Sequence, residues 1–288
     1  MICLKQYERS LIVQVCNRCP CHCPGCYNIP SKTEIRTSAI LRFLEQYKTE
    51  FNANKITLSG GDPFLKDDLS FIIDELFTQG WNISLDGIGS TLLKRKGETK
   101  LLSSLKKIRF LGLPLDGIND TTIQLFRNGV HFEECVESIR FASSVEIPIC
   151  INTVVHAKNI YEIAGIFHVI NQIECVKKWQ LFQYMAIGPG GISNKKFFSV
   201  TEEQFLMIEN YCNSIKESHI IIEPKSVTHR KNKYLLIGSD GVLWYPNQTL
   251  SSEWQTTEDE NDQRVILGSI EDRYIIKKIK ELNENKRI

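Results

Sequence analysis

The chain has 288 residues, of which 42% are hydrophobic and 24% are charged, and its formal net charge is +1. This length can bury one large core, and no apolar run reaches the roughly 18 residues that a membrane-spanning helix needs. The balanced charge argues against nucleic-acid binding, and the charged residues Lys5, Glu8 and Arg9 argue against a secretory signal. The sequence therefore predicts a cytoplasmic globular protein that uses no membrane.

Six short apolar runs have the character of buried strands, and amphipathic helical patterns lie between them. The runs cover residues 11–15, 56–59, 83–86, 108–116, 147–155 and 179–187. Alternating strands and helices predict an α/β fold with a parallel sheet, either open or curved into a barrel. We expect the last run, from Trp179 to Gln183, to fill the interior of such a barrel.

The alternation stops after Gly188-Pro-Gly-Gly191. Thr201-Glu-Glu-Gln204 has the pattern of a capping box, which predicts the start of a helix. Short apolar runs separated by turn residues follow, so residues 191–288 are expected to form a helix and a small β-rich extension. The polar, acidic stretch from Ser251 to Gln263 predicts a mobile loop.

Five of the ten cysteines lie between residues 16 and 26, directly after the first predicted strand. Cys19, Cys23 and Cys26 have the spacing C-x3-C-x2-C. Iron–sulfur clusters are held by cysteine thiolates, and three ligands leave one iron of a [4Fe–4S] cluster with an open position. These three cysteines are therefore the predicted metal ligands.

Two other metal sites fit the same segment. Cys16-x2-Cys19 and Cys23-x2-Cys26 form a double C-x2-C pattern, which in a scaffold protein could hold a structural zinc ion. The two pairs are closer together than in usual zinc ribbons. A four-thiolate electron-transfer centre that includes Cys16 is the second alternative. We expect Cys16 to end the first strand and Cys21 to point away from the ligands.

Two motifs carry a resemblance to a known family. Cys19-Pro-Cys-His-Cys-Pro-Gly-Cys-Tyr27 and Ser59-Gly-Gly-Asp-Pro63 resemble the radical S-adenosylmethionine (radical SAM) superfamily, and the resemblance extends to about residue 187. It implies a partial (βα)6 TIM-like barrel over residues 1–190. It also implies a [4Fe–4S] cluster that cleaves S-adenosylmethionine to a radical able to remove hydrogen from a substrate. Gly25 departs from the superfamily, which usually has an aromatic residue there, and resembles the variant found in glycyl-radical activases.

The resemblance also implies which residues contact S-adenosylmethionine. Its amino group is expected at Gly60, Gly61, Asp62 and Pro63, and its carboxylate at Arg127, since arginine suits bidentate contact with a carboxylate. The other expected contacts follow the cluster or lie at strand ends, where barrels bind ligands; they are Tyr27, Asp86, Asp116, Asn152 and Gln183. Asp86-Gly87 and Asp116-Gly117 are also consistent with simple turns.

The second half of the chain is similar to viperin and its molybdenum-cofactor and peptide-maturase relatives, through Ile151-Asn-Thr153 and Lys178-Trp179. Lys55 and Lys178 match basic residues that bind a nucleoside triphosphate in viperin-type enzymes, whereas Cys150 and Gln180 replace two others. We expect a small or nucleotide-like substrate, with peptide maturation or glycyl-radical activation as alternatives. The family also implies an electron donor such as flavodoxin or ferredoxin.

Overall fold

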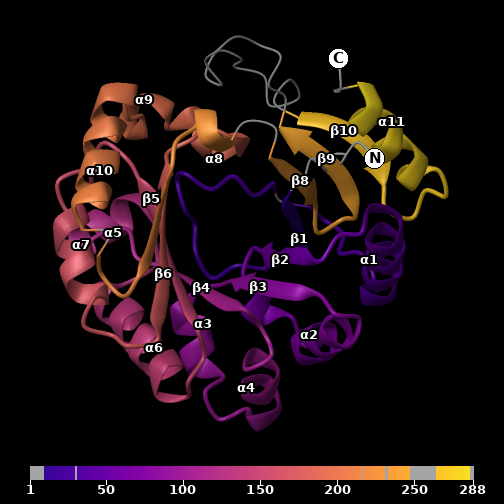
Figure 1. Cartoon of the computed structure of the whole chain (residues 1–288), viewed down its shortest axis with the longest axis horizontal. Coiled ribbons are helices and arrows are strands. Elements are labelled where there is room, and N and C mark those ends of the chain that lie inside the picture. The colour runs from indigo at the N-terminus through magenta and orange to yellow at the C-terminus, as the bar shows by residue number, and fades with distance from the viewer. Residues whose placement is uncertain (1–9, 30, 216, 231–232, 247–263, 286–288) are drawn as a thin grey trace.

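A computed structural model describes residues 10–29, 31–215, 217–230, 233–246 and 264–285. The strands in these residues form one curved sheet in the order β10-β9-β8-β1-β2-β3-β4-β5-β6-β7 (Figure 1). Its centre is six parallel strands: β1 Ser10–Cys16, β2 Lys55–Gly60, β3 Asn82–Asp86, β4 Phe110–Pro114, β5 Ile149–Val155 and β6 Val176–Gln183. Each predicted strand is present in the sheet.

Helices between these strands lie around the outside of the curve (Figure 1). They are α1 Thr37–Phe51, α2 Leu69–Thr78, α3 Gly89–Lys94, α4 Thr99–Leu105, α5 Asp120–Phe126, α6 Phe132–Ser144 and α7 Ile163–Ile170, with a 3-10 turn η1 at Pro63–Leu65. Each long helix buries one face, as α1 does with Ile40, Phe43 and Leu44. The chain therefore has the predicted partial TIM-like architecture of alternating strands and helices.

The later strands extend this sheet at both edges, and helices lie between them in the chain. They are α8 Gly188–Ser193, α9 Lys195–Phe198, α10 Glu202–Ser214, β7 Ile221–Lys225, η2 Thr228–Arg230, β8 Tyr234–Ile237, β9 Val242–Pro246, β10 Arg264–Ser269 and α11 Ile275–Asn285. Strand β7 pairs in parallel with β6, and β8 pairs in parallel with β1. The expected division at residue 190 stays a prediction, although the sheet continues across it. The loop expected from Ser251 to Gln263 lies outside the described residues.

The capping box before α10 is formed as expected: the Gln204 amide donates to Thr201 Oγ1 at 3.2 Å, and the Thr201 amide donates to Gln204 Oε1 at 3.0 Å. None of the helices in the described residues combines the length and apolar character that crossing a membrane requires.

Strand β6 differs from its prediction in position and orientation. It covers Val176–Gln183, because the apolar residues after Gln183 leave the sheet. Trp179 does not fill the interior of the barrel; its ring stacks on Phe167 of α7, and its Nε1 donates to Thr153 Oγ1 at 2.9 Å. Since side chains alternate along a strand, the neighbouring Lys178 and Gln180 face the inside instead.

Candidate active site

A cavity of about 500 Å³ follows the inner face of the sheet. It extends from the starts of the parallel strands, at residues such as Lys55, to their ends, at residues such as Gly60. Five residues of strand span roughly 16 Å. This size and depth suit a site for a cofactor together with a small substrate.

The predicted ligands Cys19, Cys23 and Cys26 line the cavity in one loop after β1, which we call the cysteine loop (residues 17–29). Cys16 is the last residue of β1, as expected, and lies outside the cavity lining. Cys21 is buried and also outside the lining. The described residues contain no three His, Cys, Asp or Glu side chains grouped around a single metal ion, and a [4Fe–4S] cluster needs no such group because its cysteines bind different irons.

The first part of the cysteine loop is bonded to the Gly-Gly-Asp-Pro segment at the end of β2. The Gly61 amide donates to Cys16 O at 2.7 Å, and the Asp62 amide donates to Arg18 O at 2.8 Å. A Cβ on Gly61 would overlap Arg18 O and lie 2.7 Å from Asn17 O. Gly60 has φ +155°, and a Cβ there would lie 3.0 Å from the Cys16 amide nitrogen. The two glycines thus allow β2 to approach the loop closely.

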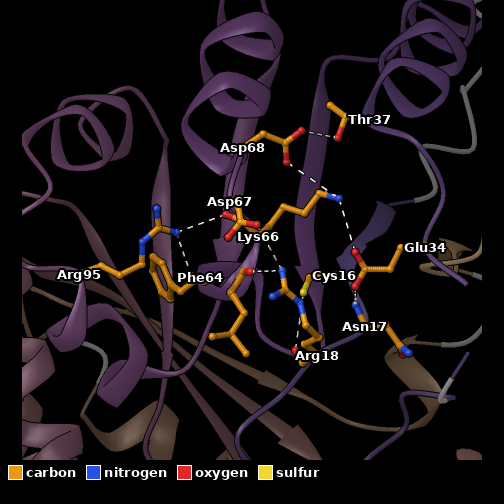
Figure 2. Close-up of polar contacts among 11 residues, drawn as sticks. Cys16, Asn17, Arg18, Glu34, Thr37, Phe64, Lys66, Asp67, Asp68 and Arg95 are labelled. Atoms are coloured by element: carbon orange, nitrogen blue, oxygen red, sulfur yellow. Dashed lines mark hydrogen bonds and ion pairs between the residues drawn. The ribbon is translucent and has the colours of Figure 1, made fainter. Parts of the chain in front are cut away.

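Side chains outside the cavity hold the base of the same loop (Figure 2). The Asn17 amide donates to Glu34 Oε1 at 2.8 Å, and Lys66 Nζ lies 3.6 Å from Glu34 Oε2 and 3.9 Å from Asp68 Oδ1. The Ser31 amide donates to Asn17 Oδ1 at 3.2 Å, which joins the two ends of the loop. The Lys66 side chain is only 13% exposed, so this ion pair is partly shielded from solvent.

The electrostatic surroundings of the cysteines favour thiolates at two of the three predicted ligand positions. A hydrogen bond with the Cys21 thiol, aided by the positive charge of Arg127, lowers the pKa of Cys23 to about 7. The same thiol lowers the pKa of Cys19. Cys26 is the exposed member of the three. The prediction that Cys21 points away from the ligands stays a prediction; its side chain is buried and lies outside the cavity lining. Thiolates are the form that binds metal, so the three cysteines fit the chemistry of a [4Fe–4S] cluster.

The expected cofactor residues Asp86 and Asn152 line the cavity together. Asn152 Nδ2 donates to Asp86 Oδ1 at 2.9 Å, although the two residues are on β3 and β5. Gly112 on the intervening β4 leaves room for this contact, because a Cβ there would overlap the Asp86 carboxylate. Burial raises the pKa of Asp86. Tyr27 also lines the cavity and is 38% exposed.

Arg127 and Asp116 form an ion pair with unequal access to the cavity. The Arg127 guanidinium lines the cavity, and its Nε donates to Asp116 Oδ2. Asp116 is 1% exposed and lies outside the lining, where its Oδ1 also accepts a hydrogen bond from the Val154 amide at 2.6 Å. The Asp116 carboxylate is thus bonded to Arg127 and to the Val154 amide, and it is placed to orient the Arg127 side chain.

Three other expected cofactor residues have structural partners. Asp62 is fully buried, and its Oδ1 accepts hydrogen bonds from the Phe64 and Ile88 amides, both at 3.2 Å. Pro63 is the first residue of η1; neither Asp62 nor Pro63 belongs to the cavity lining. Gln183 lines the cavity, but its side-chain amide is bonded to the backbone of two other segments.

The α8 segment holds the cysteine loop from another side, which the sequence did not reveal. A Cβ on Gly188 would lie 2.8 Å from Tyr27 O, and one on Gly190 would lie 2.6 Å from Pro24 O. Asn194 Nδ2 donates to Pro24 O at 3.1 Å. The Gly188-Pro-Gly-Gly191 run indicated only a break in the strand–helix alternation, whereas its glycines permit close contact with the loop.

A set of cationic side chains from other segments also lines the cavity. We call it the basic wall; its members are Lys55, Arg109, Lys178, Lys225 and Arg230. Lys55 and Lys178 were expected from the sequence. The other three were missed, because they come from three separate segments and only the fold brings them to one cavity.

Aromatic rings and one carboxylate order the basic wall. Arg109 Cζ and Lys178 Nζ lie 5.4 Å and 5.8 Å from the centre of the Phe110 ring. Lys178 and Lys225 share Glu223, at 2.8 Å and 3.4 Å. Burial lowers the pKa of Lys225, and burial also lowers that of Arg230 to about 10. An anion bound here would favour the charged form of both side chains.

Comparisons with known proteins agree with these features. The sequence profile of the Radical SAM superfamily matches residues 13–168. GTP 3',8-cyclases of Staphylococcus epidermidis (strain ATCC 35984) and Staphylococcus aureus (strain JH9) are each 26% identical to this chain, over 163 and 161 residues. Each match covers 51% of this chain and 46% of the relative, so the chain aligns with about half the length of these relatives.

Solved structures share the fold at low sequence identity. Streptococcus suis SuiB bound to S-adenosylmethionine has a TM-score of 0.67 at 11% identity, covering 94% of this chain and 65% of that one. The anSMEcpe structure with bound S-adenosylmethionine has a TM-score of 0.64 at 16% identity, covering 96% and 82%. Since the superfamily profile spans more than half of the chain, this protein belongs to the radical SAM superfamily, whose enzymes use a [4Fe–4S] cluster and S-adenosylmethionine.

Proposed function

We propose that Cys19, Cys23 and Cys26 hold the [4Fe–4S] cluster and that the basic wall binds an anionic, nucleotide-like small molecule as substrate. The cluster and S-adenosylmethionine, when bound, supply a 5'-deoxyadenosyl radical that removes a hydrogen atom from the substrate. The protein supplies binding, orientation and exclusion of water.

Side chains near the cysteine loop are suited to hold S-adenosylmethionine. Gly60 and Gly61 expose backbone groups for its amino group, while Arg127, oriented by Asp116, offers a guanidinium for its carboxylate. Asp86 and Asn152 offer hydrogen-bonding groups at the inner face of β3 and β5, where a ribose can be bound. An electron donor such as flavodoxin or ferredoxin is part of the same proposal.

The observation that carries the choice of substrate is the charge of the cavity lining. Among the described residues it contains six cationic side chains, those of the basic wall and Arg127, but one carboxylate, that of Asp86. Two carboxylates behind the lining offset part of this charge: Asp116 pairs with Arg127, and Glu223 pairs with Lys178 and Lys225. Lys178, Lys225 and Arg230 are partly buried in this cavity, where cations repel each other. An anionic ligand is therefore favoured, and phosphate groups match several such donors at once.

Two further features support a nucleotide rather than a simple anion. Phe110 and Phe182 lie among the cations of the basic wall and offer apolar faces to a base or sugar. The curated relatives are named for a reaction of GTP. Cys150 and Gln180 stand where two viperin-type cations are missing, but Lys225 and Arg230 add positive charge nearby.

The test is release of 5'-deoxyadenosine by the anaerobically reconstituted protein with dithionite and S-adenosylmethionine. GTP, CTP and UTP are compared with their nucleosides and with short peptides. We expect a triphosphate to accelerate release, and its nucleoside to do so far less, because the phosphates contact the basic wall.

Lys178→Met and Lys177→Met form a matched pair for this test. Lys178 lines the cavity, whereas its neighbour Lys177 is exposed on the outside of β6. Loss of one charge-assisted contact should raise the half-maximal nucleotide concentration about tenfold or more in Lys178→Met and leave Lys177→Met unchanged. Acceleration by a peptide but by no nucleotide would reject the proposed substrate class and favour a peptide maturase.

A further inference from the structure

A row of polar side chains crosses the sheet from the proposed cofactor contacts to the basic wall. Asn152 on β5 pairs in register with Gln180 on β6, and Gln180 pairs with Glu223 on β7. At the other end of the row, Asn152 Nδ2 donates to Asp86 Oδ1 at 2.9 Å. Gln180 therefore lines the cavity directly beside a residue that is proposed to hold S-adenosylmethionine.

Glu223 fixes the direction of the Gln180 amide. Gln180 Nε2 donates to Glu223 Oε2 at 3.1 Å. Burial opposes ionisation of Glu223, but the hydrogen bond from Lys178 and the charge of Lys225 lower its pKa, so it is a carboxylate. A carboxylate only accepts hydrogen bonds, so the nitrogen of the amide must face it. Among the described residues, no donor lies within hydrogen-bond distance of Gln180 Oε1, which leaves this oxygen as an unused acceptor in the cavity lining.

The groups around this acceptor are cationic. Lys178 is two residues before Gln180 and therefore on the same face of β6. Lys225 Nζ lies 3.4 Å from Glu223 Oε2, the oxygen that also accepts from Gln180. A phosphate bound by these lysines is itself an acceptor and offers no hydrogen to Gln180 Oε1. The partner of Gln180 must therefore be an O–H or N–H group close to the phosphates.

We infer that Gln180 accepts a hydrogen bond from a ribose hydroxyl of the substrate and thereby selects ribonucleotides over deoxyribonucleotides. The inference rests on the proposed function. The sugar of a nucleotide is bonded to its phosphates, and from Lys178 and Lys225 it reaches Gln180 in the direction of Asn152. The reacting part of the substrate has to lie close to the cofactor, which favours this placement. Without the hydroxyl, the amide oxygen would lose its partner.

The experiment measures the Kd of GTP and CTP, and of their 2'-deoxy and 3'-deoxy analogues, by calorimetry. The protein is reconstituted and holds S-adenosylmethionine, and dithionite is left out so that no cleavage occurs. One of the two deoxy analogues should bind wild-type protein about threefold to tenfold more weakly than the ribonucleotide. Gln180→Met keeps the length of the side chain but removes the amide, and should reduce this preference to less than about twofold.

Two further variants are measured in the same way. Gln172→Met removes the same amide from an exposed position after α7 and should keep the wild-type preference. Glu223→Gln can donate as well as accept, so the Gln180 amide is free to turn and the preference should fall to about half or less. The changed contacts of Lys178 and Lys225 affect both ligands and cancel in the ratio. This variant also carries the test if Gln180→Met does not fold.

The results separate this inference from the proposed function. Wild-type protein that binds no nucleotide would reject the proposed substrate class, and this inference with it. Nucleotide binding without a preference for the ribonucleotide would overturn the Gln180 contact alone. The same preference in wild type and Gln180→Met, or an unchanged preference in Glu223→Gln, would also overturn it. Loss of the preference in Gln172→Met would do so too, because it would show that the effect is not local to Gln180.

Discussion

The cysteine loop and the basic wall face the same cavity, but different kinds of contact hold them. The loop is fixed mainly by backbone bonds and by glycines that let other segments approach, as at Gly61 and Gly190. The basic wall consists of side chains from separate segments, ordered by Phe110 and Glu223. The cysteine loop therefore depends on the position of the backbone. The basic wall, in contrast, can gain or lose one charge at a time.

The largest effect expected from this comparison is that of Gly61→Ala. The added methyl group would overlap Arg18 O, so either β2 or the cysteine loop must move. We expect a loss of about 1–3 kcal/mol in the free energy of unfolding and a marked loss of iron uptake. Urea unfolding and iron analysis measure the two effects.

Gly97→Ala is the control for that substitution, since no atom outside its chain neighbours lies within 4 Å of a Cβ there. It should change the free energy of unfolding by less than about 0.5 kcal/mol and leave iron uptake unchanged. Equal behaviour of the two variants would show that close approach at Gly61 does not position the loop.

A smaller effect is expected from His156, which stacks on Phe126 of the cavity lining. Burial, with the positive charges of Arg127 and Lys158, lowers its pKa to about 3. His156 binds a proton near pH 6.5 in the unfolded chain but only near pH 3 in the folded chain. The contribution of His156 to the free energy of unfolding is therefore fully present above pH 6.5. Below pH 6.5 it falls by about 1.4 kcal/mol for each pH unit.

Urea unfolding of the iron-free protein at pH 7, 6 and 5 tests this dependence. His156→Asn keeps an acceptor in place of Nδ1, which accepts from the Lys158 amide at 3.2 Å, and should flatten the decline between pH 6.5 and 5 by roughly 2 kcal/mol. His168→Asn, on the exposed face of α7, should keep the wild-type slope. An unchanged slope in His156→Asn would mean that His156 is protonated in the folded protein.

The sequence predicted those parts of the molecule in which local pattern and tertiary structure agree. Hydrophobic runs located the six central strands, and the spacing of Cys19, Cys23 and Cys26 marked a loop that reaches the cavity. Trp179 was placed on the wrong face, because a mostly apolar run does not reveal which side of a strand meets the helices.

The polar residues were harder to interpret, since their partners are distant in sequence. Asp116 has the position of a ligand contact at a strand end, yet it is buried against Arg127. Cys21 alternates with the predicted ligand cysteines, and its side chain is buried outside the cavity lining. Arg230 reaches the cavity only through the turn after β7. Such contacts depend on how loops bend, which composition and spacing do not specify.

The central claim is that Cys19, Cys23 and Cys26 hold a cluster that supports cleavage of S-adenosylmethionine. Anaerobic reconstitution followed by iron analysis and measurement of 5'-deoxyadenosine release tests it most directly. Wild-type protein and Cys16→Ala should bind about four irons per chain and release 5'-deoxyadenosine with dithionite, whereas alanine at any of the three ligand positions should abolish both. Stoichiometric zinc without iron uptake, a requirement for Cys16, or an assembled cluster that never cleaves S-adenosylmethionine would contradict the claim.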